Sequence, residues 1–185
     1  TNMVSNYLRL RGLPIYWLDV RTVIKTDSRY REGGVHWEVT EQLVKAKLEP
    51  LIDSQLVITQ GFLGSTVENH TTTLGREGSD YTAGIFAYCS NAESVTIWKD
   101  VPGMLNADPK YFENTVKLDQ ISFKEAIELS YYGASVIHPK TIKPLQNKNI
   151  PLHVKCFADA SLPGTVIHNN PVSVIEIANS QIGNC

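Results

Sequence analysis

The sequence has no excess of charge of either sign. Its 185 residues carry 17 Lys and Arg against 19 Asp and Glu, which gives a formal net charge of −2 at pH 7. Without a basic surplus there is no general electrostatic attraction for nucleic acid or for an anionic membrane surface. We therefore expect small-molecule ligands, and neither a nucleic-acid nor a membrane partner.

Cysteines are few, and long apolar runs are missing. The three cysteines, Cys89, Cys156 and Cys185, are widely spaced and odd in number, which argues against a disulfide framework and a zinc site. No apolar run approaches the roughly 18 residues that span a bilayer, and no secretory signal pattern is visible at the start. These absences predict a cytoplasmic protein with no metal site of its own. Since the first residue is Thr1 and not Met, we also expect a processed chain or part of a longer protein.

Two familiar phosphate-binding patterns are absent. There is no Gly-x-x-x-x-Gly-Lys-Ser/Thr run, and only Gly75-x-x-Gly78 is present where a dinucleotide fingerprint needs a third glycine. The sequence therefore gives no support for a P-loop or a dinucleotide-binding domain.

What is present is an ordinary globular composition with alternating elements. Hydrophobic residues make up 42 % and charged residues 19 % of the chain. Short β-branched runs alternate with helical patterns, which is typical of an α/β fold with a largely parallel sheet. The pattern predicts strands at 15–20, 56–59, 95–98, 152–157 and 172–177, and helices at 37–48 and 81–91. A further helix is expected to begin at Ser122, which forms a capping-box pattern with Glu125, and to end before Gly133.

The segment Thr71–Asp80 (TTTLGREGSD) is rich in hydroxyls and glycines and precedes the predicted helix at 81–91. The N-terminus of a helix attracts anions through its free backbone N–H groups and its dipole. Arg76 adds a planar guanidinium suited to a carboxylate or a phosphate. Two interpretations stay open at this point. Asp80 either caps the helix or acts on a substrate, and the glycines either serve a ligand or only make a turn.

The complete string resembles the aspartokinase signature. The resemblance continues, in unbroken order, through IWKDVPG at 97–103, NADP at 106–109, EAIELSYYGASVIHP at 125–139, IPLHVK at 150–155 and PGT at 163–165. It implies a three-layer αβα sandwich around a mostly parallel sheet, the amino-acid-kinase-like fold, incomplete at the N-terminus. Residues 1–168 would be the C-terminal part of the catalytic domain and 169–185 an unassigned tail, with no regulatory ACT domain.

The resemblance also implies an activity. Aspartokinases transfer the γ-phosphoryl group of ATP to the β-carboxylate of L-aspartate, at the entry to lysine, threonine and methionine biosynthesis, with ATP and Mg²⁺ as the expected cofactors. The complete protein would be a homo-oligomer. By the same resemblance Arg76, Ser79 and Asp80 bind the substrate, and Asp80 is the expected catalytic residue, orienting the amino group or catalytic lysines. The residues implied at the nucleotide are Lys99, Asp100, Leu105, Lys110, Ser135 and Val136.

Several positions depart from the family pattern. Glu77 replaces a glycine of the loop, and Lys99 replaces a threonine. Leu105 stands where an aromatic residue is frequent, and Ser135 where a lysine is expected. The glycine-rich phosphate loop that begins the family's catalytic domain is not recognised either, so the chain would open in a later helix that includes residues 6–11. A non-catalytic fragment or remnant that binds nucleotide or amino acid is therefore the alternative, and another enzyme of the same fold, such as a glutamate or acetylglutamate kinase, is a third possibility.

Overall fold

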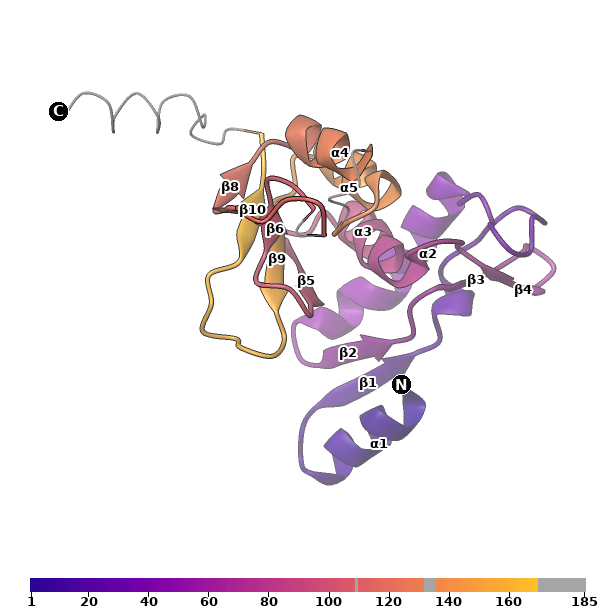
Figure 1. Cartoon of the computed structure of the whole chain (residues 1–185). Helices are drawn as coiled ribbons and strands as arrows, with labels where there is room; N and C mark the ends of the chain where they lie inside the picture. The colour runs from indigo at the N-terminus through magenta and orange to yellow at the C-terminus, as the bar shows by residue number, and fades with distance from the viewer. Residues whose placement is uncertain (109, 132–135, 170–185) are drawn as a thin grey trace, which may run out of the picture. The chain divides into compact units, whose positions relative to one another are not determined.

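Two short strands near the N-terminus pair in parallel, as their β-branched sequences predict. In the computed structural model (Figure 1), which describes residues 1–108, 110–131 and 136–169, β1 (Ile15–Leu18) lies beside β2 (Leu56–Thr59). Parallel strands need a long crossover, and α2 (Trp37–Ile52) provides it. Helix α1 (Asn2–Leu10) contacts both strands. The predicted strand 15–20 ends early because the short 3-10 helix η1 (Val20–Thr22) follows.

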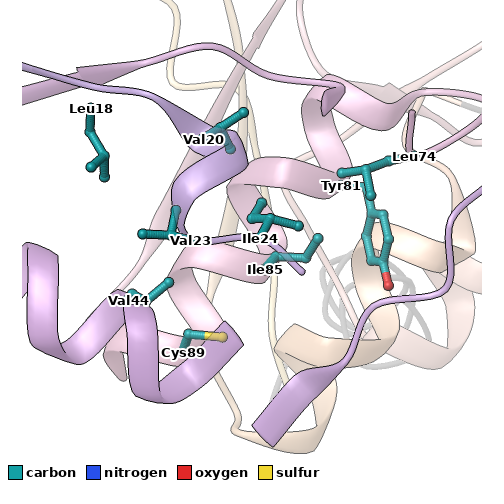
Figure 2. Packing of buried hydrophobic residues seen from close by; sticks show 9 residues of the cluster. All are labelled: Leu18, Val20, Val23, Ile24, Val44, Leu74, Tyr81, Ile85 and Cys89. Atoms are coloured by element: carbon teal, nitrogen blue, oxygen red, sulfur yellow. The ribbon is translucent and has the colours of Figure 1, made fainter. Parts of the chain in front are cut away.

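The chain divides into two compact units, Thr1–Ala92 and Glu93–Cys185. The core of the first unit forms where α2 packs against α3 (Gly78–Ser90) and the segment after β1 (Figure 2). Its buried members are Leu18, Val20, Val23, Ile24, Val44, Leu74, Tyr81, Ile85 and Cys89. The Trp37 ring meets Tyr88 edge-on at 4.9 Å between centroids, which extends this core along α2 and α3. Burial therefore fixes α3 firmly at the position where the candidate site begins.

Helix α2 presents a different face from the one that its apolar residues suggest. Val39 is 43 % exposed, whereas Thr40 is fully buried beside Val44. Thr40 tolerates burial because its Oγ1 accepts a hydrogen bond from the Lys25 backbone N–H at 3.1 Å. A buried polar group is stable when it is hydrogen-bonded, so the buried face of α2 can include Thr40 while Val39 stays exposed.

The loop that leads to the candidate site contains an unpredicted hairpin. Strands β3 (Leu63–Ser65) and β4 (Thr71–Thr73) pair antiparallel, with Ser65 opposite Thr71. Two strands of only three residues each, with the sequences LGS and TTT, carry no periodic apolar signal. The pairing therefore became visible only in the structure.

In the second unit, four strands form one sheet in the order β5-β9-β10-β8. The strands are β5 (Val95–Lys99), β8 (Gln120–Ile121), β9 (Leu152–Cys156) and β10 (Thr165–Ile167). β5 and β9 are parallel, as are β8 and β10, while β9 and β10 are antiparallel. A separate hairpin consists of β6 (Met104–Leu105) and β7 (Lys117–Leu118). The predicted α/β class with mostly parallel pairing is confirmed.

Two helices of the second unit begin with side-chain caps. Helix α4 (Phe123–Tyr131) has the predicted capping box, because Ser122 Oγ accepts the Glu125 N–H at 3.1 Å and a Glu125 carboxylate oxygen accepts the Ser122 N–H at 2.7 Å. Helix α5 (Pro139–Asn147) is capped by His138, whose Nδ1 accepts the Lys140 N–H. None of the helices in the described part of the chain has the length and apolarity to span a bilayer.

The predicted strand at 172–177 and Gly133 lie outside the described residues. The expected domain boundary at residue 168 stays a prediction.

Candidate active site

The structure places Arg76, Ser79 and Asp80 together at the start of α3. Arg76 and Ser79 are exposed and Asp80 is half-buried in the first helical turn. The N-cap is Glu77, which makes no side-chain capping hydrogen bond. The interpretation of Asp80 as the helix cap is therefore wrong, because Ser79 and Asp80 both lie after the N-cap, within the first helical turn.

Left-handed backbone conformations surround the start of α3. Phe62, Gly75 and Glu77 have φ values of 72°, 77° and 52°. Only glycine adopts this region without strain, so Phe62 and Glu77 each cost about 1 kcal/mol or more. Gly78 is needed for close packing, since a Cβ there would lie 2.6 Å from Cδ2 of Phe62. Such strain persists where the surrounding structure enforces it and is frequent at functional sites, which supports this loop as the candidate site.

The turn at Phe62 is tied directly to α3. The Phe62 N–H donates to Thr82 Oγ1 at 2.9 Å, and the Thr82 hydroxyl donates to the Gly78 carbonyl at 2.8 Å. The Leu74 N–H donates to the Phe62 carbonyl at 2.9 Å. These bonds hold Leu74, Phe62 and the first turn of the helix as one piece.

A second brace comes from the segment 26–34. The buried hydroxyls of Thr26 and Thr72 lie 2.7 Å apart, and the Gly33 N–H donates to the Thr73 carbonyl at 2.8 Å. The segment is itself folded around Asp27, because the Arg29 and Gly34 N–H groups donate to its Oδ1 and lower the pKa of its carboxyl group. No local pattern in the sequence predicts this contact between the segment 26–34 and the loop.

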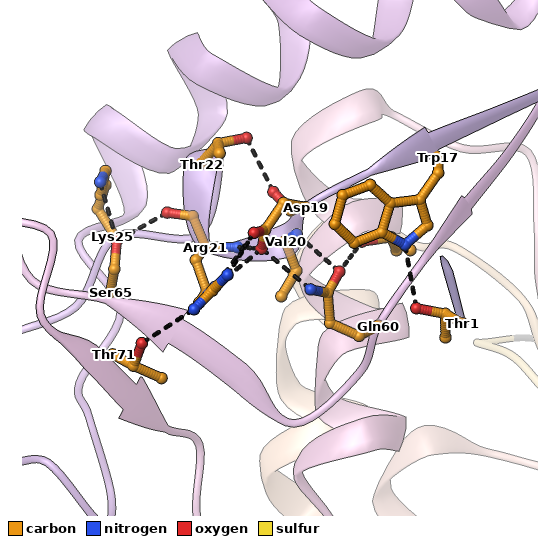
Figure 3. Close-up of polar contacts among 11 residues, drawn as sticks. Thr1, Trp17, Asp19, Val20, Arg21, Thr22, Lys25, Gln60, Ser65 and Thr71 are labelled. Carbon is orange, nitrogen blue, oxygen red and sulfur yellow. Dashed lines mark hydrogen bonds and ion pairs between the residues drawn. The ribbon is translucent and has the colours of Figure 1, made fainter. Parts of the chain in front are cut away.

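A third brace is the polar network at the ends of β1 and β2 (Figure 3). Gln60 donates through Nε2 to Asp19 Oδ1 and accepts the Val20 N–H at Oε1, both at 3.0 Å. Arg21 is paired with Asp19 at 2.6 Å and reaches Thr71 Oγ1 at 3.3 Å. The Arg21 side-chain hydrogen bond lowers the pKa of the Asp19 carboxyl group. The network therefore links both strand ends to the beginning of the loop.

An open cavity of about 450 Å³ adjoins the start of α3. Its lining residues come from α2, from β2 and the turn after it, and from α3: Leu48, Val57, Thr59, Gln60, Gly61, Ser79, Thr82, Ala83 and Phe86. Ser79 lines this space, whereas Arg76 and Asp80 do not.

The residues expected at the nucleotide lie on separate turns of the second unit. Lys99 is half-buried at the end of β5, and Asp100 is exposed in the turn that follows. Leu105 is half-buried opposite Lys117 in the β6-β7 hairpin, and Lys110 is exposed in its loop. Val136 is half-buried just before α5, whereas Ser135 lies outside the described residues. The structure brings Leu105 and Lys110 into one hairpin.

The β6-β7 hairpin is fixed through Thr165, a residue that sequence reasoning did not place in the site. Its Oγ1 accepts the Met104 N–H at 2.8 Å and donates to the Leu118 carbonyl. Gly103 permits this approach, since a Cβ there would lie 2.6 Å from Thr165 Oγ1. In the loop, Asp108 accepts the Lys110 N–H at 2.9 Å, so its carboxylate supports a turn. No set of three or more His, Cys, Asp or Glu residues in the described ranges is arranged to hold a metal ion.

Comparisons with known proteins show that this chain is similar to aspartokinases. The lysine-sensitive aspartokinase 3 of Escherichia coli is 40 % identical over 91 % of this chain, and the chain spans 38 % of that relative. The chloroplastic bifunctional aspartokinase/homoserine dehydrogenase 2 of Arabidopsis thaliana is 39 % identical over 91 % of this chain and 18 % of the relative.

A solved structure shows the same fold. The crystal structure of E. coli aspartokinase III in complex with aspartate and ADP, in the R-state, superposes with a TM-score of 0.86 and 38 % identity. The match covers 92 % of this chain and 38 % of that one. A profile described as the amino acid kinase family matches residues 1–156. The fold expected from the resemblance is thereby confirmed, and the chain belongs to the amino acid kinase family.

Proposed function

We propose that this chain is part of an aspartate kinase that transfers the γ-phosphoryl group of ATP to the β-carboxylate of L-aspartate. The observation that carries the proposal is the loop Thr71–Asp80, which places Arg76 and Asp80 at a helix N-terminus and is braced from three sides. The similarity to aspartokinases over 91 % of the chain supports it.

Arg76 would bind a carboxylate of aspartate, because its exposed guanidinium can make two parallel hydrogen bonds to a carboxylate. Ser79 would contribute a hydroxyl from the cavity side of the same turn. Asp80 would orient the aspartate ammonium group. A general base is unnecessary, since a carboxylate with a pKa of about 4 is already ionised at neutral pH.

The residues that we propose at the nucleotide carry the chemical groups that ATP binding requires. Lys99 and Lys110 offer cations for phosphate oxygens, and Asp100 offers a carboxylate for a ribose hydroxyl. Leu105 and Val136 would provide apolar contacts, and Ser135 would complete the set. Mg²⁺ would arrive bound mainly to the phosphates and neutralise their charge, as Mg²⁺ is usually held by few protein carboxylates. Phosphoryl transfer requires chiefly positioning and charge stabilisation, which fits a loop whose conformation is set before a ligand binds.

The proposal is tested by measuring ADP release from ATP and Mg²⁺ with and without L-aspartate. We expect aspartate-dependent release that Asp80→Asn abolishes. Arg76→Ala should raise the aspartate KM far more than the ATP KM, whereas Arg9→Ala, an exposed arginine on α1, should change neither. A larger effect of Arg76→Ala on the ATP KM would contradict the assignment.

The same assay distinguishes the other functions. Aspartate or nucleotide binding without turnover would identify a non-catalytic binding protein. Faster turnover of glutamate or N-acetylglutamate than of aspartate would identify a different kinase of this fold. We propose a cytoplasmic location and a homo-oligomeric complete enzyme; fractionation and light scattering of that enzyme would test them.

A further inference from the structure

Glu32, a residue outside the recognised motifs, lies against the turn that carries Arg76. It forms an antiparallel bridge with Leu74, and a Cβ built on Gly75 would lie 2.9 Å from its Cγ and 3.2 Å from its Oε1. The carboxylate of Glu32 therefore occupies the side of Gly75 where another residue would have its side chain. Glu32 and Arg76 are both exposed at the surface of the first unit.

The backbone around Glu32 is hydrogen-bonded to β4 on both sides. The Thr73 N–H donates to the Tyr30 carbonyl at 2.7 Å, and the Thr73 hydroxyl donates to the Arg31 carbonyl at 2.6 Å. The Gly33 N–H donates to the Thr73 carbonyl at 2.8 Å. These hydrogen bonds hold the backbone of Glu32 in register with β4 and therefore fix its position relative to Gly75.

The two charges suit one class of ligand. A guanidinium binds a carboxylate, and a nearby carboxylate binds an ammonium group, so the pair is complementary to an α-amino acid. A ligand with the same carboxylates but no amino group would meet Glu32 as a like charge. Such a repulsion between like charges is stronger at a partly desolvated site than in bulk water.

We propose that Glu32 is a specificity-determining residue, which selects the ammonium group of the amino acid whose carboxylate Arg76 holds. This inference rests on the proposed function, because it assigns a further role within the same amino-acid site. Asp80 approaches from the helix, whereas Glu32 approaches from the segment 26–34, so the two carboxylates can be tested separately.

The experiment compares L-aspartate with succinate, which has two carboxylates and no amino group. The 185-residue chain labelled with ¹⁵N is titrated with each ligand, and the dissociation constants are taken from the backbone amide shifts of residues 73–80. The wild-type chain should prefer L-aspartate. Glu32→Gln, which keeps the size of the side chain, should reduce the preference about tenfold, since a charge-assisted hydrogen bond contributes about 1.4 kcal/mol or more.

The controls separate recognition from structure. Glu38→Gln, at an exposed glutamate in the first turn of α2, should leave the preference unchanged. Glu32→Asp should restore part of it, and Glu32→Ala replaces Glu32→Gln if the glutamine variant does not fold. An unchanged preference in a folded Glu32 variant overturns the inference and leaves the proposed function standing. Absence of aspartate binding to the wild-type chain counts against both.

Discussion

The two units hold their proposed ligand residues in different ways. In residues 1–92, Arg76, Ser79 and Asp80 share one turn whose backbone is braced by the Phe62 turn, by the segment 26–34 and by the Asp19 network. In the second unit the corresponding residues lie on separate turns, and the β6-β7 hairpin is fixed largely through one residue, Thr165. In the first unit several hydrogen-bonded segments hold the proposed ligand residues, whereas in the second unit much of this support comes from the single residue Thr165. Single substitutions should therefore damage the second unit more.

The largest effect is expected from Gly164→Ala. Gly164 has a φ of 79°, and a Cβ there would overlap the Val154 carbonyl oxygen. We expect the free energy of unfolding of the second unit to fall by about 3 kcal/mol or more. Gly12 has a similar φ of 87° but open space around it, so Gly12→Ala should cost only about 1 kcal/mol. Urea unfolding followed by amide signals from each unit measures the free energy of unfolding of both variants. Equal losses would show that the cost depends on the left-handed backbone conformation and not on the space around the glycine.

Thr165→Val should have the next largest effect. The substitution keeps the shape of the side chain but leaves the buried Met104 N–H without its acceptor, at a cost of about 2 kcal/mol. Thr165→Ser retains the hydroxyl and should recover most of this loss. In the first unit, Thr26→Val removes one of many braces and should cost about half as much. A larger loss from Thr26→Val would contradict the distinction between distributed and concentrated support.

The helix N-termini provide a smaller contrast. Ser122→Ala removes the capping hydrogen bond of α4 and should lower the free energy of unfolding by about 1 kcal/mol. Glu77→Ala should cost less than half of that, because Glu77 makes no side-chain capping bond to α3 and alanine has the same left-handed strain. Thermal unfolding of the two variants against the wild type checks the order.

The smallest effects concern pH, in different ranges for the two units. Burial, with the charges of Lys155 and His168, lowers the pKa of His153 below its ordinary 6.5. Unfolding lets His153 bind a proton more readily, so its contribution to stability is lost as pH falls below about 6.5. The Arg21 hydrogen bond lowers the pKa of Asp19 below 3.8, so its contribution is lost only below about pH 3.8.

We therefore expect acidification from pH 7 to 5 to weaken the second unit through His153 while the Asp19 contribution stays constant. His153→Gln should flatten the pH dependence of the second unit in this range, and Asp19→Asn should flatten that of the first only near pH 3 to 4. Unit-resolved hydrogen exchange provides the measurement. A wild-type pH dependence retained in His153→Gln would assign the effect to another group.

Sequence patterns predicted those elements of the fold that depend on residues close together in the chain. The strand at 56–59 and the capping box at Ser122 were predicted correctly because β-branched runs and capping residues act over a few neighbours. The apolar pattern alone would place Val39 on the buried face of α2, but Val39 is exposed and Thr40 is buried, where it accepts a hydrogen bond from the Lys25 N–H. The roles of Arg76 and Asp80 came from the family resemblance, and they stay predictions until the proposed variants are measured.

The sequence by itself determined the α/β class, the family resemblance and the loop that carries Arg76, because these depend on composition and on residues in unbroken order. Only the tertiary structure decided what holds that loop. The hydroxyl pair of Thr26 and Thr72, and the position of Glu32 against Gly75, join segments more than 40 residues apart. Such contacts leave no periodic pattern in either segment, because they depend on where the chain returns in space and not on its local conformational preference.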